Sequence, residues 1–516
     1  MTIKKILLCA GFCFLIISCK SNLPVIEVNT ANTISKSIIG NGVQWSAYPH
    51  ADSKNSEWGA LMTDKKWKEL YKRLDYMRPH FMRVMDQANW RYYKGLDTDG
   101  QPILEFDNEE IQSLFKILDY CQKNDITVLI GEWGTPYHMH DKHNTKDKLN
   151  DATDPRWISM ITKWIDFLIN DKGYTCIKYY DFINEPNGAW ASTLGRYKEW
   201  IEGVNLLHQS FEKAGLLSSI TIAAPGTVPM ANSRYDRTVK GHEWMLKVAE
   251  DHDDIVGAYN THMYTSYTQI EEETLVDDYY IARDVKLADE RGKPFFLGEI
   301  GIKASKDHHK AENEARARKD GFASSDSNLW IYEFSYGVDM VKAAILCMNA
   351  GVDGLIAWDL DDAMHTKGDL ADIHSLKRWG FWNILGTEII NRPEDEKIRP
   401  WYYTWSWLCK YIPPKSDIIN VKNIKLPEGI KLMVAKHQND FSVFVVNASE
   451  NEISFNLKMD IAEKKDFLSH SYLEDNFNKK EMEMVIDTKE VGGVDLSRGL
   501  KVSIPENSVR VYTTIR

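Results

Sequence analysis

The chain has 516 residues, of which 43% are hydrophobic, and a formal net charge of -12. This length suffices for one large domain of about 250 to 400 residues and a smaller one. Because acidic residues outnumber basic ones and no long basic block occurs, nucleic acid is a poor candidate partner.

The first 19 residues have the pattern of a targeting segment. Lys4 and Lys5 precede an apolar stretch, 6–17, that is too short to span a membrane. The sequence Ile16-Ile17-Ser18-Cys19 resembles a bacterial lipobox, which implies cleavage before Cys19 and lipidation of that residue. We therefore expect a cell-envelope lipoprotein held by its lipid at the outer membrane, facing the periplasm or the cell surface. A secreted protein with an incidental cysteine is the alternative.

Strand-like and helix-like segments alternate along the body of the chain, which predicts an α/β fold built as a (β/α)8 TIM barrel over residues 37–412. The expected strands are 37–45, 80–85, 126–131, 178–184, 219–224, 256–264, 294–299 and 354–359. The expected helices are 64–77, 108–123, 155–170, 194–214, 275–291 and 330–350, with a last helix at 400–411 that ends before two prolines.

Residues 413–516 have a different texture, with short β-branched runs at 430–436, 441–447, 453–457 and 509–515. They predict a small antiparallel β-sandwich. Residues 20–36 are expected to be a tether and an N-terminal strand, 25–29, that joins this sandwich. The charged segment 303–328 predicts a lid or helical insertion; a metal site at Asp307-His308-His309 is the less favoured interpretation.

Four cysteines follow the leader: Cys121, Cys176, Cys347 and Cys409. They are widely spaced and lack the C-x-x-C pairs or nearby histidines of a metal site. We predict buried thiols, although an extracytoplasmic location would permit a disulfide.

Two carboxylates end strand-like runs. Glu185 follows Asn184 after the fourth expected strand, and Glu299 ends the seventh. In a β/α barrel the chemistry lies where the strands end, so these acids are expected to converge. A converging pair of acids is the machinery of glycoside hydrolysis. Ordinary ion-pair partners are the alternative for each acid alone.

The surroundings of the two acids predict different roles. Glu185 stands beside a neutral amide, and burial among aromatic residues raises a carboxyl pKa, which suits a proton donor. Glu299 emerges between Gly298 and Gly301, where a sugar could approach closely, and suits a nucleophile. Arg83 is a lone cation in an apolar strand and needs a buried partner, for which Glu299 is the candidate.

With these residues in this order, the sequence resembles glycoside hydrolase clan A over residues 37–412. The matching positions are Arg83, Asn184, Glu185, His262, Tyr264, Glu299 and Trp358. The resemblance implies a retaining barrel enzyme that needs no metal or cofactor, with Glu185 as acid/base and Glu299 as nucleophile.

The resemblance also assigns supporting roles. His262 and Tyr264 are two apart and so point to one side of a strand; in the clan such a tyrosine hydrogen-bonds the nucleophile. Trp358 matches the tryptophan that floors the subsite of the reacting sugar. Three of the matching residues have a structural alternative. His262 could be a core histidine, Tyr264 could serve packing alone, and Arg83 could be a purely structural charge.

Further candidates lie near the expected strand ends. Trp45, Trp90, Trp133 and Trp190 are each either a sugar platform or a core residue. Glu132 either binds a substrate hydroxyl or faces a helix outside the barrel.

Family membership within the clan stays open. The third expected strand ends in Gly131-Glu132-Trp133-Gly134 without the histidine common in family 5, and the pattern resembles families 39 and 30 as much. We expect cleavage of β-linked glycosides, or of linkages with equivalent geometry, in plant or microbial poly- or oligosaccharides. Long loops at 138–154 and 303–328 favour exo action; an endo-glycanase and a non-catalytic glycan-binding lipoprotein are the alternatives.

Overall fold

The computed structural model describes residues 23–136, 149–303 and 307–516. The expected lipidation site, Cys19, and most of the loop 138–154 lie outside the described residues. Among the helices that are described, none has both the length and the apolar character that a membrane span requires.

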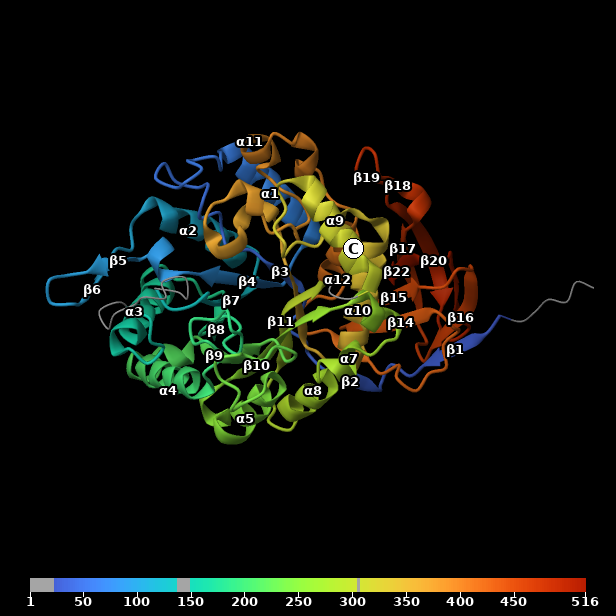
Figure 1. The fold of residues 1–516 in the computed structure, drawn as a ribbon. Coiled ribbons are helices and arrows are strands. Elements are labelled where there is room, and N and C mark those ends of the chain that lie inside the picture. The colour runs from blue at the N-terminus through green and yellow to red at the C-terminus, as the bar shows by residue number, and fades with distance from the viewer. Residues whose placement is uncertain (1–22, 137–148, 304–306) are drawn as a thin grey trace, which may run out of the picture.

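Eight parallel strands close into a barrel in chain order, which confirms the predicted fold (Figure 1). They are β3 (Gly42–Gln44), β4 (Phe81–Asp86), β7 (Thr127–Glu132), β8 (Ile177–Asp181), β9 (Thr221–Thr227), β10 (Ala258–Thr265), β11 (Phe295–Ile302) and β12 (Gly354–Ala357). The first strand is much shorter than expected. Ser37 and Gly40 both adopt positive φ, a conformation that no continuous strand contains.

Helices surround the barrel and bury their apolar faces against it (Figure 1). They are α1 (Asp64–Met77), α2 (Glu109–Lys123), α3 (Pro155–Asp166), α4 (Tyr197–Lys213), α5 (Trp244–Asp251), α6 (Tyr267–Glu271), α7 (Leu275–Asp278), α8 (Ile281–Asp289), α10 (Phe334–Ala350), α11 (Gly386–Ile390) and α12 (Trp401–Lys410). The expected helix 275–291 is broken into α7 and α8 at Tyr280, whose φ is 60°. Side chains cap several starts, such as Asn108, which accepts from the Ile111 amide at 3.0 Å.

The C-terminal region contains an antiparallel seven-stranded sheet and a smaller three-stranded one, which pack a common apolar core. The larger sheet has the order β2 (Thr33–Ser35), β13 (Asp417–Ile419), β14 (Ile430–His437), β15 (Asp440–Asn447), β22 (Ser508–Thr513), β17 (Lys464–Tyr472) and β20 (Asp487–Asp495). The smaller has β1 (Val25–Val28), β16 (Ile453–Met459) and β21 (Leu500–Ile504). Both N-terminal strands therefore lie in these sheets, and β1 runs parallel to β16.

The insertion after β11 is helical, as the helical-insertion alternative predicts: α9 covers Asp307–Asp320. His309 stacks on Tyr267 with ring centroids 4.3 Å apart. Asn313 ties the helix to the following loop by donating to the Ser327 carbonyl at 2.8 Å.

The four cysteines of the body, Cys121, Cys176, Cys347 and Cys409, are all buried and free. The prediction of buried thiols is therefore confirmed.

A buried ion network fixes the long segment that follows β12. Asp362 is fully buried and accepts from Arg399 (Nη1 to Oδ1, 3.0 Å) and from the amides of Trp379 and Gly380 at 2.9 and 2.8 Å. Arg378 also contacts Asp362, with Nε 3.4 Å from Oδ2. This network joins three stretches of chain that helix or strand hydrogen bonds do not connect.

We predict that Asp362→Asn lowers the free energy of unfolding by about 3–5 kcal/mol, because it leaves the buried Arg399 without a carboxylate partner, although Arg378 keeps Asp320 and Asp395. Urea denaturation followed by tryptophan fluorescence measures the change. The matched control is Glu463→Gln, which removes an exposed carboxylate 2.8 Å from Lys465 and should cost no more than about 1 kcal/mol. Equal losses in the two variants would contradict the structural role of the network.

Candidate active site

The two acids are delivered by the ends of β8 and β11. After β8 the chain turns sharply, and Glu185 adopts a φ of 45°. The turn is held by its backbone, since the Asn184 amide donates to the Glu132 carbonyl at 3.0 Å and the Glu185 amide to the Gly226 carbonyl at 3.1 Å. Glu299 lies within β11 itself. Both side chains therefore stand on backbone that neighbouring strands hold in place.

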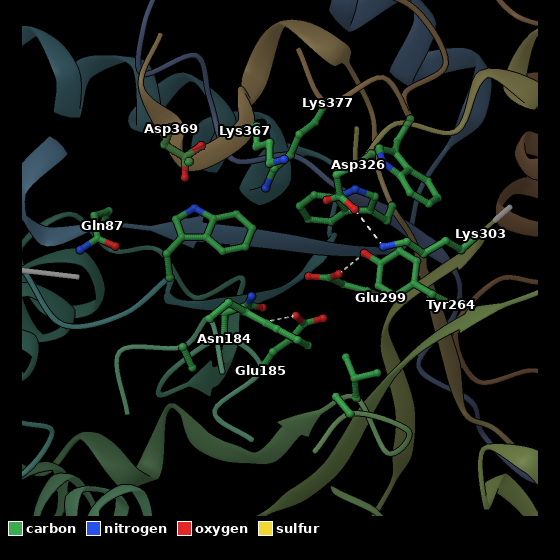
Figure 2. Close-up of a pocket in the computed structure, with 18 of the residues that line it drawn as sticks. Gln87, Asn184, Glu185, Tyr264, Glu299, Lys303, Asp326, Lys367, Asp369 and Lys377 are labelled. Atoms are coloured by element: carbon green, nitrogen blue, oxygen red, sulfur yellow. Dashed lines mark hydrogen bonds and ion pairs between the residues drawn. The ribbon is translucent and has the colours of Figure 1, made fainter. Parts of the chain in front are cut away.

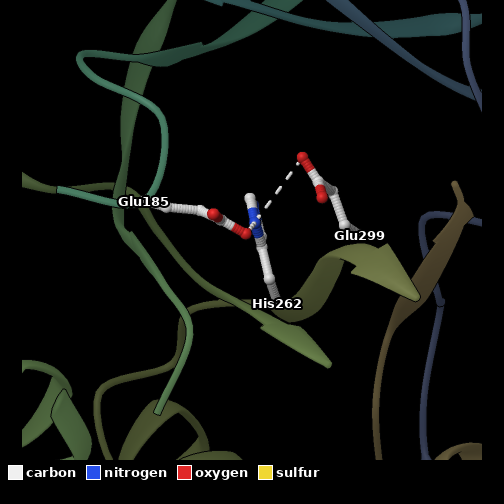
Figure 3. Close-up of side chains that lie close together, drawn as sticks. All are labelled: Glu185, His262 and Glu299. Atoms are coloured by element: carbon white, nitrogen blue, oxygen red, sulfur yellow. Dashed lines mark hydrogen bonds and ion pairs between the residues drawn. The ribbon is translucent and has the colours of Figure 1, made fainter. Parts of the chain in front are cut away.

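The two carboxylates converge. One oxygen of Glu185, one of Glu299 and a ring nitrogen of His262 all lie within 4.8 Å of one another (Figure 3). Retaining glycosidases separate their carboxyl groups by about 5–5.5 Å, whereas inverting enzymes need about 6.5–9.5 Å to admit a water. The observed spacing therefore matches the retaining geometry.

Glu299 is surrounded by donors. Arg83 Nη1 donates to Oε1 and the Tyr264 hydroxyl donates to Oε2, so the expected contact between Arg83 and Glu299 is present. Burial, reinforced by the charge of Glu299, raises the pKa of Tyr264 far above its ordinary value, so its hydroxyl stays a donor. A guanidinium and a phenol therefore fix the position of the Glu299 side chain.

Glu185 has a less polar environment. Burial raises the pKa of this carboxyl, and a hydrogen bond from Trp190 Nε1 to Oε2 at 2.7 Å partly opposes the shift. His262 Nδ1 lies 3.0 Å from Oε1, and burial lowers the pKa of His262 to about 3, so the imidazole is neutral. No lysine or arginine among the described residues lies within 4.0 Å of Glu185, and burial favours the protonated form of this carboxyl.

Asn184 is oriented by Arg83, whose Nη2 donates to the amide Oδ1 at 2.5 Å. The same guanidinium donates from Nη1 to Gln44 Oε1 at 3.2 Å. With its oxygen used, Asn184 has its Nδ2 donor left for the cavity that it lines.

The glycines beside Glu299 make room for neighbouring side chains. A Cβ at Gly298 would lie 3.0 Å from His262 Nε2, and one at Gly301 would lie 3.3 Å from Trp379 and Tyr264. Small residues are needed here because these side chains pack against the β11 backbone. Their role in the approach of a sugar stays a prediction.

These groups open into a cavity of about 1020 Å³ (Figure 2). Its lining includes both acids, Asn184, Tyr264 and five tryptophans, Trp90, Trp133, Trp190, Trp358 and Trp379. The ring of Trp358 stacks on that of His365 with centroids 5.5 Å apart. Trp133 contacts Trp358 edge-on, with centroids 5.8 Å apart. The aromatic faces form an apolar wall beside polar acids, as binding of a sugar ring requires.

Two candidates are placed elsewhere. Trp45 is fully buried against α1, with its ring 6.0 Å from that of Trp67. Side chains alternate along a strand: Gln44 points inward to Arg83, so Trp45 points outward. Its sugar-platform interpretation is therefore wrong.

Glu132 likewise ends β7 on the outer side of the barrel. It accepts from the Tyr92 hydroxyl at 2.6 Å and from the Ala88 amide at 3.0 Å. It does not line the cavity, which corrects its substrate-binding interpretation and agrees with the alternative of a partner outside the barrel.

Several lining residues have no counterpart in the sequence prediction. They come from the segments after β11 and β12 and include Lys303, Asp326, Lys367, Asp369, Lys377 and Trp379. Such residues follow no strand or helix period, so no local pattern marks them. The sequence feature that could indicate these residues is the length of the two segments, because long loops at strand ends often carry functional residues.

Glu185, His262 and Glu299 are also side chains of the kinds that bind metal ions. However, Arg83 and Tyr264 already donate to both oxygens of Glu299, and a guanidinium at this position repels a cation. The donor set therefore fits an acid pair better than a metal centre.

A comparison with protein-family models gives no match, and neither does a comparison with curated protein sequences. Solved structures do match. A GH30 endoxylanase from Clostridium papyrosolvens C71 superimposes with a TM-score of 0.58 at 12% identity, covering 95% of this chain and 100% of the other.

Two further matching structures are an arabinofuranosidase and a GH39 enzyme. An alpha-L-arabinofuranosidase from Thermotoga maritima has a TM-score of 0.59 at 13% identity, over 95% of this chain and 99% of that one. A GH39 enzyme from Xanthomonas axonopodis pv. citri has a TM-score of 0.57 at 11% identity, over 96% and 97%. The fold of this chain thus resembles that of clan A glycoside hydrolases.

Proposed function

We propose that the chain is a retaining glycoside hydrolase that cleaves β-linked glycosides, or linkages with equivalent geometry, by double displacement. The observation that carries the proposal is the convergence of Glu185 and Glu299 to within 4.8 Å inside an aromatic-lined cavity. The proposed substrates are plant or microbial poly- and oligosaccharides, since the similar structures include a xylanase and an arabinofuranosidase.

In the first step, a Glu299 oxygen attacks the anomeric carbon while the bond from that carbon to the leaving oxygen breaks. The proton of Glu185 passes to the leaving oxygen, and a glycosyl ester on Glu299 remains. In the second step, Glu185 takes a proton from water as the water oxygen attacks the anomeric carbon and the ester bond breaks. Two inversions at one carbon retain its configuration.

The surrounding residues suit this sequence. Arg83 and Tyr264 hold Glu299 as a carboxylate aimed at the cavity. The free Nδ2 of Asn184 can donate to a sugar hydroxyl next to the reacting carbon, an interaction that strengthens as positive charge develops on the ring. Trp358 supplies a flat apolar surface for the ring itself.

Exo action remains our proposal, because the segments after β11 and β12 both add residues to the cavity wall, among them Lys303, Asp326 and Lys367. An endo-glycanase is the alternative. Early digestion products separate the two: monosaccharides indicate exo action, and mixed oligomers indicate endo action.

We predict that Glu185→Gln lowers kcat on natural glycosides by about 10²–10⁴-fold, the usual contribution of a general acid. For nitrophenyl glycosides the rate of the first step should fall less, because their leaving group needs little protonation. Glu299→Gln should abolish turnover of both substrate types. Steady-state kinetics on matched substrates measures these losses.

The matched control is Glu212→Gln on the exposed face of α4, which should keep wild-type kinetics. Circular dichroism establishes that each variant is folded. Full activity in a folded Glu185 or Glu299 variant, or inverted product configuration by proton NMR, would refute the mechanism.

A pH dependence follows from the hydrogen bond between Trp190 and Glu185. Because the indole N–H stabilises the carboxylate, Trp190→Phe should raise the pKa of Glu185 further. The enzyme needs Glu185 protonated, so the basic limb of the kcat/KM profile should move to higher pH. Trp90→Phe, which alters another cavity tryptophan, should leave that limb in place; an unmoved limb in the Trp190 variant would contradict the assignment.

We also propose that Cys19 is lipidated and anchors the protein to the cell envelope; the lipobox-like Ile16-Ile17-Ser18-Cys19 supports this. Several acyl chains at about 0.8 kcal/mol per buried methylene would suffice. Cys19→Ala should move the protein from the detergent phase to the aqueous phase in Triton X-114 partitioning and abolish palmitate labelling. Cys13→Ala in the same leader should change neither, and a Cys19 variant that stays anchored would exclude this lipid.

A further inference from the structure

Charged side chains of both signs line the cavity. Four carboxylates, Glu185, Glu299, Asp326 and Asp369, and three lysines, Lys303, Lys367 and Lys377, contribute to its lining. Lys303 directly follows β11, whereas Lys367 and Lys377 come from the segment after β12. Figure 2 shows Lys367 and Lys377 across the cavity from Glu185.

Lys303 already has a counter-charge, since its Nζ lies 2.8 Å from Asp326 Oδ1. Within the described residues Lys367 has a neutral partner, since its Nζ donates to the Ser325 hydroxyl at 2.6 Å. Lys377 forms no ion pair within 4.0 Å among residues 23–136, 149–303 and 307–516. Two of the three ammonium groups therefore lack a direct anionic partner in the described structure.

Lys377 is held against the sugar-binding wall. Its Nζ lies 6.0 Å from the centroid of Trp358, and its backbone amide donates to the His365 carbonyl at 3.0 Å, next to the ring that stacks on Trp358. Burial alone would lower the pKa of Lys377, but surrounding carboxylates, led by Asp369, raise it. The side chain therefore keeps its charge in the half-buried cavity wall.

The two lysines differ in burial, since Lys377 is partly buried and Lys367 is exposed. The charge of Lys377 is stabilised from a distance by carboxylates, first Asp369 and Asp326 and then Glu299 and Glu185. Neither lysine forms a direct ion pair within the described residues, so a ligand that brings an anion within hydrogen-bond distance gains a charge-assisted contact.

We propose that Lys377 and Lys367 form a subsite for an anionic substituent, a carboxylate or a sulfate ester, carried by the sugar that binds against Trp358. The inference rests on the proposed glycosidase function for its sugar and narrows the substrate class to acidic glycans. Both lysines lie on the segment after β12, across the cavity from Glu185.

Binding tests the subsite independently of turnover. Isothermal titration of the folded wild-type protein is done with matched monosaccharide pairs: glucuronate and glucose, galacturonate and galactose, mannuronate and mannose. Glucose 6-sulfate and galactose 6-sulfate extend the neutral members to sulfate esters. We expect at least one acidic member to bind at least tenfold more tightly than its neutral partner, about 1.4 kcal/mol. The uronate and sulfate arms distinguish the two anion types.

Variants identify the residues responsible. Lys377→Gln combined with Lys367→Gln should remove at least nine-tenths of that preference, and Lys377→Arg alone should retain it because the charge is kept. Lys198→Gln, which removes an exposed lysine of α4, is the matched control and should bind as wild type. Thermal melting establishes that the double variant is folded; if it is not, single Lys377→Gln and Lys367→Gln variants are titrated in its place.

The inference is overturned if every neutral sugar binds as tightly as its acidic partner, if no member of any pair binds at 10 mM (about the upper end of weak affinities), or if the preference survives in the lysine variants. None of these results bears on whether Glu185 and Glu299 cleave glycosides. Conversely, full turnover in the Glu185 or Glu299 variants would refute the proposed function while leaving the measured anion preference intact.

Discussion

The site depends on one buried cation. Arg83 has no exposed surface, and its guanidinium joins Gln44 near the end of β3 to Asn184 after β8 and to Glu299 in β11. Burying a charge is expensive, and an ion pair in a protein interior often stabilises no better than apolar packing would. The role of Arg83 is better explained by positioning. Its planar guanidinium hydrogen-bonds three side chains from different parts of the barrel and so fixes their relative geometry.

The same cation gives the two acids different surroundings. Burial raises the pKa of Glu185, and the charge of Arg83 opposes that shift without contacting the carboxyl group. Arg83 donates directly to Glu299, whereas the side-chain hydrogen bonds of Glu185 within the described structure are with the neutral groups of Trp190 and His262. The asymmetry needs no special property of either glutamate, since it follows from which neighbour reaches each one.

Much of this arrangement is predictable from strand periodicity. Eight apolar runs separated by helical patterns predict the barrel, and a spacing of two residues predicts that His262 and Tyr264 share a side; the structure shows them contacting Glu185 and Glu299, respectively. The same alternation, applied to Gln44 and Trp45, would have placed the tryptophan outside. Glu132 fails for a related reason, because the last residue of a strand can face either way and only its partner Tyr92 decides.

The rest of the cavity is not predictable in this way, because its walls come from irregular chain. Lys303, Asp326 and Lys377 occupy positions set by turns and by long-range contacts such as the network around Asp362, none of which leaves a period in the sequence. Different parts of the chain therefore have different roles in the site. Strands of the barrel fix the reacting acids, while the segments after β11 and β12, held by Asp362 and its arginines, surround the part of a ligand that does not react. Because the two sets of contacts share few residues, the charge of the cavity wall can differ among proteins with this fold without disturbing the distance between Glu185 and Glu299.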